Sequence, residues 1–326
     1  MSRYQAVCGT EGGVAVVRLI DANRETEAAV AVGVGNVAYE LKVRGKNYLW
    51  FPFADPGEFL RHPRTCGVPF LAPWANRIDG DSYWVNGRRH SLNPEIGNLR
   101  RDPNGKPIHG LLRYSQDWVL AEAGADENSA WVTSRLDFGA HPDLMAQFPF
   151  THTITMTYRL TDGVLEVATR LANLSSEALP VAIGFHPYFQ LHDAPRDTWK
   201  VHLAARSHMM LDGELIPTGD ARPLDFADPH PLSAGQLDDV FGDLVRDGDG
   251  RAHFWVEGAK ERVSVWYGSN YPVAVVYAPE GQGFICFEPM AAVTNAFNLA
   301  HAGLYRGLQS VAPGGEWTES FWIEVG

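Results

Sequence analysis

The sequence has 326 residues, 45% of them hydrophobic and 20% charged, which is typical of a folded globular protein with a substantial core. The formal net charge is −12, which argues against nucleic acid and acidic membrane surfaces as partners, because both require a basic protein surface. The three cysteines are far apart in the sequence, so neither a disulfide framework nor a clustered zinc site is expected.

The first residues, Met1 to Gln5, lack the basic segment and apolar run of a secretion signal, and no later stretch is apolar enough to cross a membrane. We therefore expect a cytoplasmic protein. No linker, repeat or low-complexity tract divides the chain, so we predict a single domain over residues 1–326. A monomer and a homodimer are equally compatible with the sequence.

The first half of the chain is rich in strand and turn patterns. The glycine-rich segment 33–38 resembles a dinucleotide-binding loop, but the alternating residues 39–43 that follow predict a strand rather than the helix such a loop needs. We interpret the segment as a turn between strands. Asn86-Gly87 separates residues 83–85 from residues 89–92 and predicts a hairpin, because both central residues tolerate positive φ.

Alternation of polar and apolar residues continues to the C-terminus. Further strands are predicted at 131–138, 151–160, 164–174, 252–256, 262–267, 273–277 and 321–325. Residues 233–240 predict a short helix capped by Ser233. The pattern predicts an all-β protein built as one large antiparallel β-sandwich or barrel with few short helices.

Asn76 and Arg77 stand next to each other just after the apolar run 68–71. The amide of asparagine both donates and accepts hydrogen bonds, and arginine offers a rigid fork of donors, so the pair suits recognition of hydroxyl groups. A strand end with a surface arginine explains this segment equally well when it is taken alone.

Two histidines and one glutamate stand beside apolar or glycine residues. His109 precedes Gly110, which lets a backbone or a ligand approach the imidazole, although a buried structural histidine is as good an explanation. His186 follows the apolar run 179–183 and is flanked by aromatic residues, where burial shifts the pKa of an imidazole and favours a functional role. Glu288 ends a hydrophobic strand, where a carboxylate is costly unless it is functional or held in a salt bridge.

Other kinds of site are poorly supported. The sequence has 12 histidines but no closely spaced pair beside a suitable acid, so we expect no metal ion. It contains no Gly-x-Ser-x-Gly elbow, which argues against a serine hydrolase.

Taken in order, these motifs resemble the aldose 1-epimerase (galactose mutarotase) family over nearly the whole chain. The resemblance is carried by Asn76-Arg77-Ile78, His109-Gly110, residues 186–189, residues 237–241 and residues 287–290, followed by residues 294–298 and 312–314. It implies a galactose mutarotase-like supersandwich with a concave sugar site and no cofactor.

The resemblance also implies roles for individual residues. Glu288 would be the general base on the anomeric hydroxyl of a monosaccharide, and His186 the acid at the ring oxygen. His109 would assist at the reacting end, and the sugar hydroxyls would be bound by Asn76, Arg77 and Asp238. Asp239 is the alternative to Asp238, because the matching segment is short.

The sequence leaves the substrate and the reaction open in several respects. Residues 95–107 and Ala291-Ala292 depart from the family pattern, so the sugar is not fixed. A hexose-6-phosphate 1-epimerase would need phosphate ligands, for which the sequence offers Arg100, Arg101, Lys106 and Arg113. A carbohydrate-binding module without activity on the same scaffold is also compatible with the sequence, as is a glycosidase with Asp238 as second carboxylate.

Overall fold

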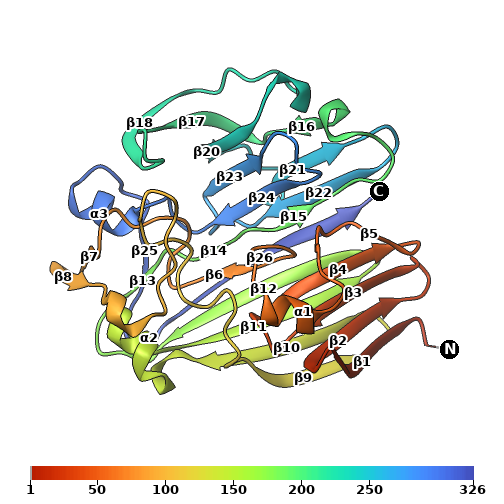
Figure 1. Ribbon diagram of the computed structural model, residues 1–326, viewed down its shortest axis with the longest axis horizontal. Coiled ribbons are helices and arrows are strands. Elements are labelled where there is room, and N and C mark those ends of the chain that lie inside the picture. The colour runs from red at the N-terminus through yellow and green to blue at the C-terminus, as the bar shows by residue number, and fades with distance from the viewer. Residues whose placement is uncertain (1) are drawn as a thin grey trace.

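Antiparallel strands are the main secondary structure of the computed structural model, which describes residues 2–326 (Figure 1). The largest sheet has nine strands, in the order β19 (His230–Pro231), β16 (Lys200–His202), β21 (Ala252–Glu257), β22 (Arg262–Tyr267), β26 (Glu316–Val325), β12 (Val164–Asn173), β11 (His152–Thr161), β10 (Ala130–Asp137) and β9 (Val119–Ala125). The polar and apolar alternation of β11 and β12 matches their burial, so one face of this sheet lies in the core.

A second sheet has eight strands and carries the candidate site. Its order is β18 (Pro217–Pro223), β17 (Ala205–Leu211), β20 (Leu237–Leu244), β23 (Val273–Ala278), β24 (Ile285–Met290), β14 (Gly184–Phe185) and β6 (Phe70–Leu71), with β15 (Tyr188–Phe189) also paired to β24. This sheet packs on the nine-stranded sheet through buried aromatic rings: Phe185 lies 4.8 Å from Phe321 between ring centroids, and Phe287 lies 6.1 Å from Phe254. The two sheets form the layers of a sandwich.

The N-terminal strands form a third sheet, with the order β1 (Tyr4–Glu11), β2 (Val14–Asp21), β3 (Thr26–Ala31), β4 (Val37–Val43) and β5 (Lys46–Asn47). It lies against the β9–β11 part of the nine-stranded sheet, as the red and yellow-green strands of Figure 1 show. The hydroxyl of Tyr158 on β11 donates a 2.8 Å hydrogen bond to the carbonyl of Asn36 in the turn before β4. The glycine-rich segment is thus a turn between strands, as predicted.

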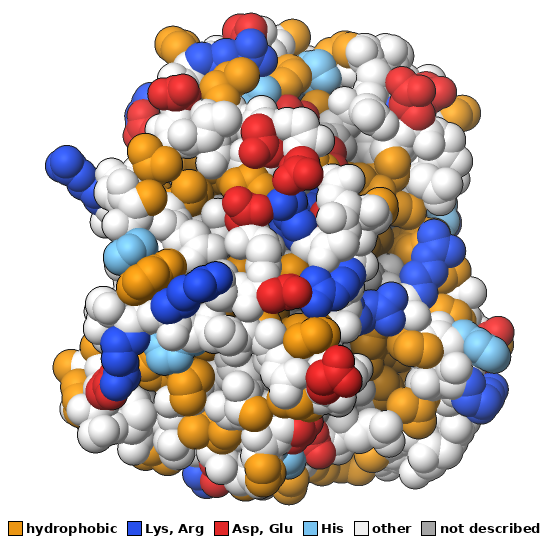
Figure 2. Space-filling view, turned by 60° about the vertical axis from the view of Figure 1, so that its left-hand side comes forward, with side chains coloured by type: hydrophobic (Ala, Val, Ile, Leu, Met, Phe, Trp, Pro, Cys, Tyr) orange, Lys and Arg blue, Asp and Glu red, His pale blue; other side chains and the backbone are white. Residues whose placement is uncertain are grey.

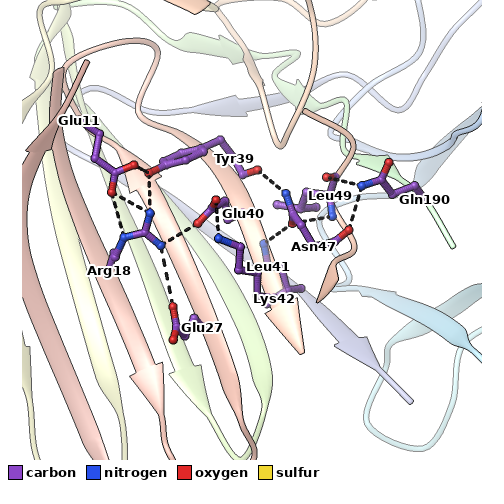
Figure 3. A network of polar contacts seen from close by, with 10 residues as sticks. All are labelled: Glu11, Arg18, Glu27, Tyr39, Glu40, Leu41, Lys42, Asn47, Leu49 and Gln190. Atoms are coloured by element: carbon purple, nitrogen blue, oxygen red, sulfur yellow. Dashed lines mark hydrogen bonds and ion pairs between the residues drawn. The ribbon is translucent and has the colours of Figure 1, made fainter. Parts of the chain in front are cut away.

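A polar network crosses the third sheet and reaches the segment after β15 (Figure 3). Arg18 pairs with Glu11 and Glu40 at 2.7 Å each. The Asn47 side chain accepts the amide of Leu41, and its carbonyl accepts a 2.9 Å hydrogen bond from Gln190. This bond ties the N-terminal sheet to the segment that follows the candidate histidine.

The remaining elements are short. Two small ribbons pair β7 (Ser82–Val85) with β8 (Arg88–Ser91) and β13 (Leu179–Val181) with β25 (Gln309–Val311). The helices are α1 (Pro56–Arg61), α2 (Pro142–Gln147) and α3 (Ala296–His301), with single turns of 3₁₀ helix at Pro94–Ile96, Phe138–Ala140, Arg196–Thr198 and Leu232–Ala234. None of the helices between residues 2 and 326 is long and apolar enough to cross a membrane.

The predicted all-β class and the Asn86-Gly87 hairpin are confirmed, with φ values of 51° and 73° at the two turn residues. The helix predicted at 233–240 is wrong. A 3₁₀ turn ends at Ala234, Gly235 adopts φ 136°, and β20 begins at Leu237. The apolar residues Leu237, Val240 and Phe241 have helical spacing in sequence, but β20 pairs with β17 on one side and β23 on the other, and these residues are buried in that strand.

Candidate active site

One face of the eight-stranded sheet presents polar side chains to a cavity. Asp238 on β20 is opposite Tyr277 on β23, and Val275, two residues earlier on β23, is opposite Glu288 on β24. Because residues two apart in a strand point to the same side, and directly paired residues do too, these four side chains share one face. The register of the sheet therefore brings Asp238 and Glu288 to the same cavity.

His186 lies in the short connection between β14 and β15. Its backbone amide donates a 3.1 Å hydrogen bond to the carbonyl of Pro69, and its ring stacks on Tyr188 at 4.6 Å between centroids with an interplanar angle of 7°. These contacts aim the imidazole at Glu288, and Nε2 of His186 lies 3.3 Å from Oε1 of the carboxyl. Both side chains are almost fully buried.

His109 reaches the same place from a loop. Its backbone has φ 63°, and its amide donates a 2.8 Å hydrogen bond to the carbonyl of Asn76, which itself has φ 55°. Gly110 is required next to it, because a Cβ at that position would lie 2.1 Å from the carbonyl oxygen of Ala72. The His109 ring meets His186 edge to face at 5.4 Å between centroids.

Arg77 is held by two partners. Its Nε donates to Oδ2 of Asp102 at 2.7 Å, and its Nη1 donates to Oδ1 of Asn76 at 2.9 Å. Burial opposes ionisation of Asp102, but the hydrogen bonds from Arg77 and from the Lys106 amide outweigh that effect and lower the pKa of the carboxyl. The guanidinium is thereby fixed in direction.

All six predicted site residues line one cavity of about 400 Å³. The complete lining is Asn76, Arg77, Asp102, Pro103, Asn104, Ile108, His109, His186, Tyr188, Leu215, Asp238, Val275, Tyr277 and Glu288. A cavity of this size that combines apolar walls with a few convergent polar groups is typical of a small-molecule site.

Burial controls the charges of Glu288 and His186. The pKa of Glu288 is raised well above its ordinary value, first by burial and then by the charge of Asp238, with Arg77 opposing the rise. Burial lowers the pKa of His186 to about 3. Both shifts favour a neutral pair in which Glu288 carries the single shared proton.

Burial also shifts the pKa values of two neighbouring groups, His109 and Asp238. Burial and then the charge of Arg113 lower the pKa of His109 well below its ordinary value, so this imidazole is neutral near pH 7. Burial raises the pKa of Asp238. Within the chain as described, no hydrogen-bond partner is present for Nδ1 of His109, Nδ1 of His186 or Oε2 of Glu288. Buried polar atoms without partners are costly, and their convergence is typical of a functional site.

The choice between the two adjacent aspartates is visible in the sheet. Asp238 lines the cavity, whereas Asp239 points to the opposite face and pairs with Nε2 of His208 at 2.8 Å. Sequence reasoning placed Asp102 in a segment expected to shape the pocket, without a role of its own, and assigned no role to Leu215 or Tyr277. Asp102 and Leu215 lie in loops, where no periodic pattern indicates the direction of a side chain.

Across residues 2–326, no three side chains of His, Cys, Asp or Glu are grouped in a way that could hold a metal ion. The cavity is instead lined by two imidazoles, one guanidinium and three carboxyls, one of which, Asp102, is paired with that guanidinium. This set can move protons between oxygen atoms and bind hydroxyl groups. The fold and the site together define a β-sandwich protein with a cavity lined by ionisable side chains.

The aldose 1-epimerase family matches residues 18–324, and the chain belongs to this family. The Escherichia coli K12 proteins YihR and YphB are 25% and 23% identical to it, over 70% and 83% of this chain and 70% and 90% of their own lengths. A galactose mutarotase-like protein from Clostridium acetobutylicum has the same fold, with a TM-score of 0.86, 21% identity and 98% of both chains covered. Galactose 1-epimerase from Lactobacillus acidophilus superposes with a TM-score of 0.76 at 14% identity, covering 100% of this chain and 99% of its own.

Proposed function

We propose that this protein is an aldose 1-epimerase that interconverts the α and β anomers of a free aldose. The observation that carries the proposal is the 3.3 Å contact between His186 Nε2 and Glu288 Oε1 in a cavity of about 400 Å³. Binding a sugar requires no such pair, and burying two ionisable groups side by side is costly. Acid/base work on the bound sugar explains that cost, whereas a binding module without activity does not.

The reaction requires two proton transfers and a rotation. Glu288 as carboxylate removes the proton from O1 while His186 as imidazolium donates a proton to the ring oxygen, and the bond between C1 and the ring oxygen breaks. Rotation about the C1–C2 bond presents the other face of the aldehyde. For reclosure, Glu288 returns its proton to O1, His186 takes back the proton from the former ring oxygen, and the ring closes. The proton count is unchanged at the end.

The pair needs one shared proton throughout. Ring opening leaves Glu288 protonated and His186 neutral, which is the state that burial favours through the opposite pKa shifts of the two groups. The state that begins ring opening differs only by one proton moved across the 3.3 Å contact. The cavity therefore favours the protonation state that accompanies the open-chain aldehyde, which is less stable than the ring forms of the sugar. Each proton transfer by a positioned side chain typically contributes roughly 10²–10⁴ in rate.

The other polar residues have binding roles in this proposal. Arg77 donates to sugar hydroxyls from a direction set by Asp102, and Asn76 and Asp238 add an amide and a carboxyl. His109 is neutral and donates or accepts a hydrogen bond beside the reacting end. The proton transfers need no cofactor, and the proposal includes none.

The surroundings favour a free sugar over a sugar phosphate. Of the four basic residues that the sequence offers for phosphate, Arg101 pairs with Asp81 and Lys106 pairs with two acids. Arg100 and Arg113 line a separate hollow together with Tyr114. Arg77 is the single cationic side chain of the described chain that lines the main cavity, and Asp102 already neutralises it. A phosphate would have no free cation there.

Polarimetry of freshly dissolved sugars tests the proposal directly. We expect purified protein to accelerate mutarotation of one or more free aldoses over buffer, and to act poorly on hexose 6-phosphates. No acceleration with any common aldose would refute the proposal, and a preference for the phosphates would favour the hexose-6-phosphate epimerase. Release of the aglycone from glycosides would instead indicate a glycosidase.

A further inference from the structure

Three tight loops of this chain share one hydrogen-bond pattern. In residues 102–106, 212–216 and 247–251, a carboxylate oxygen of the first residue, an aspartate, accepts the amides of the third and fifth residues at 2.9–3.0 Å. In each loop the amide of the first residue also donates to the carbonyl of the fifth. The three loops are therefore the same local structure built from different sequences.

The pattern forces a left-handed backbone at the fourth residue. Two of the loops have glycine there, Gly105 with φ 79° and Gly250 with φ 76°, as the conformation favours. The loop 212–216 has Leu215 with φ 62°. A branched side chain is rare in this region, and such strain tends to be kept where the side chain has a role. Leu215 lines the candidate active-site cavity, whereas the glycines contribute no side chain.

A salt bridge joins two of these loops. Nζ of Lys106 lies 2.7 Å from Oε2 of Glu214, and it also pairs with Asp79. The Lys106 side chain is only 10% exposed. Figure 2 shows acidic and basic side chains next to one another in the middle of this face of the molecule. The loop 102–106 contributes Pro103 and Asn104 to the cavity, so the salt bridge links the two loops, 102–106 and 212–216, that line it.

We propose that Leu215, held in place by the Lys106–Glu214 bridge, is the wall that restricts this site to sugars of a single ring. The inference rests on the proposed function. Glu288 is 1% exposed and forms the floor, while Pro103 and Asn104 are exposed at the rim. A sugar with its anomeric carbon at Glu288 would extend from the floor toward the rim, and we place its far carbons against Leu215, which lines the same cavity. A second ring attached there would occupy the position of the leucine side chain.

The test compares glucose with maltose, whose reducing ring presents the same anomeric centre but carries a second ring on O4. The ratio of kcat/KM for maltose to that for glucose is measured by polarimetry in the wild type and in the variants Leu215→Gly, Glu214→Gln and Asp79→Asn. Asp79→Asn is the matched control, because it removes a partner of Lys106 but leaves the link between the loops. Leu215→Gly also relieves the positive-φ strain, so it is expected to fold, and circular dichroism verifies this.

We expect the wild type to prefer glucose and Leu215→Gly to raise the maltose-to-glucose ratio by about tenfold or more, the effect of relieving a steric conflict of a few carbon atoms in a pocket. Glu214→Gln is expected to raise the ratio less, and Asp79→Asn to leave it unchanged. If the wild type is active but Leu215→Gly changes the maltose-to-glucose ratio no more than Asp79→Asn does, the proposed wall is overturned and the proposed activity is not.

Affinities for the two sugars from titration calorimetry separate this inference from the proposed function. If no sugar is anomerised but Leu215→Gly still raises the affinity for maltose relative to glucose, the wall stands and the epimerase activity falls. If neither the turnover ratio nor the affinity ratio responds, the wall is wrong.

Discussion

Replacing Glu288 with glutamine removes the proton acceptor while preserving shape. The amide is isosteric with the protonated carboxyl that burial favours at this position, so the cavity and the contact to His186 are retained. The loss is the proton transfer at O1, which is worth roughly 10²–10⁴ in rate, or about 2.7–5.5 kcal/mol in activation free energy. We expect kcat to fall by this factor while KM changes little, because the hydroxyl ligands are untouched.

The assay is polarimetry with freshly dissolved α-anomer, compared with buffer and with the wild type, and sugar affinity is measured separately by calorimetry. A Glu288→Gln variant that binds the sugar and retains the wild-type kcat would refute the acid/base reasoning. A variant that loses binding as strongly as turnover would show that Glu288 mainly holds the sugar.

The same substitution predicts a change in stability with pH. The raised pKa of Glu288 means that the folded state binds a proton which the unfolded state has released above about pH 4.5. Stability of the wild type therefore falls as pH rises from there toward the folded pKa. His186, with its pKa lowered to about 3, contributes the opposite slope up to about pH 6.5. The glutamine variant keeps the His186 contribution but lacks that of Glu288, so above about pH 4.5 its melting temperature should decline less, or rise more, with increasing pH than that of the wild type.

The other predictions concern the pH profile and the hydroxyl ligands. Because burial lowers the pKa of His186 to about 3, this imidazole does not titrate in the ordinary histidine range, so kcat/KM should not decline between pH 7 and about pH 5 in initial-rate measurements. A decline beginning near pH 6.5 would contradict the shift. Asp238→Asn should raise KM and should move the alkaline decline of kcat/KM to lower pH, because the charge of Asp238 helps to raise the pKa of Glu288. Asp239→Asn should leave both KM and the pH profile unchanged, because Asp239 points away from the cavity. Arg77→Lys should raise KM by about tenfold or more through the loss of one charged hydrogen bond, a result that equal KM values would contradict.

Some expectations from the sequence remain predictions. The cytoplasmic address, the single domain over residues 1–326, the lack of a metal or cofactor, and the exclusion of nucleic acid and membranes as partners rest on composition and motifs alone. Whether the protein is a monomer or a homodimer is decided by solution measurements of its mass.

The sequence by itself determined the all-β class, the hairpin at Asn86-Gly87 and the short list of candidate residues, because period-two alternation and turn chemistry are local properties. It also singled out His186 and Glu288 as costly polar residues among apolar neighbours. It mistook residues 233–240 for a helix, since the spacing of apolar residues there fits both a helix and a strand, and only pairing with β17 and β23 decides between them.

The tertiary structure alone decided how the candidates meet. The register of β20 against β23 turns Asp238 into the cavity and Asp239 away from it, a choice that adjacent identical residues cannot reveal. Asp102 meets Arg77 and Leu215 enters the cavity from loops whose direction depends on long-range contacts. The 3.3 Å contact between His186 and Glu288 joins residues from two segments about a hundred positions apart, and their opposite pKa shifts arise from burial that exists only after the sheets have packed.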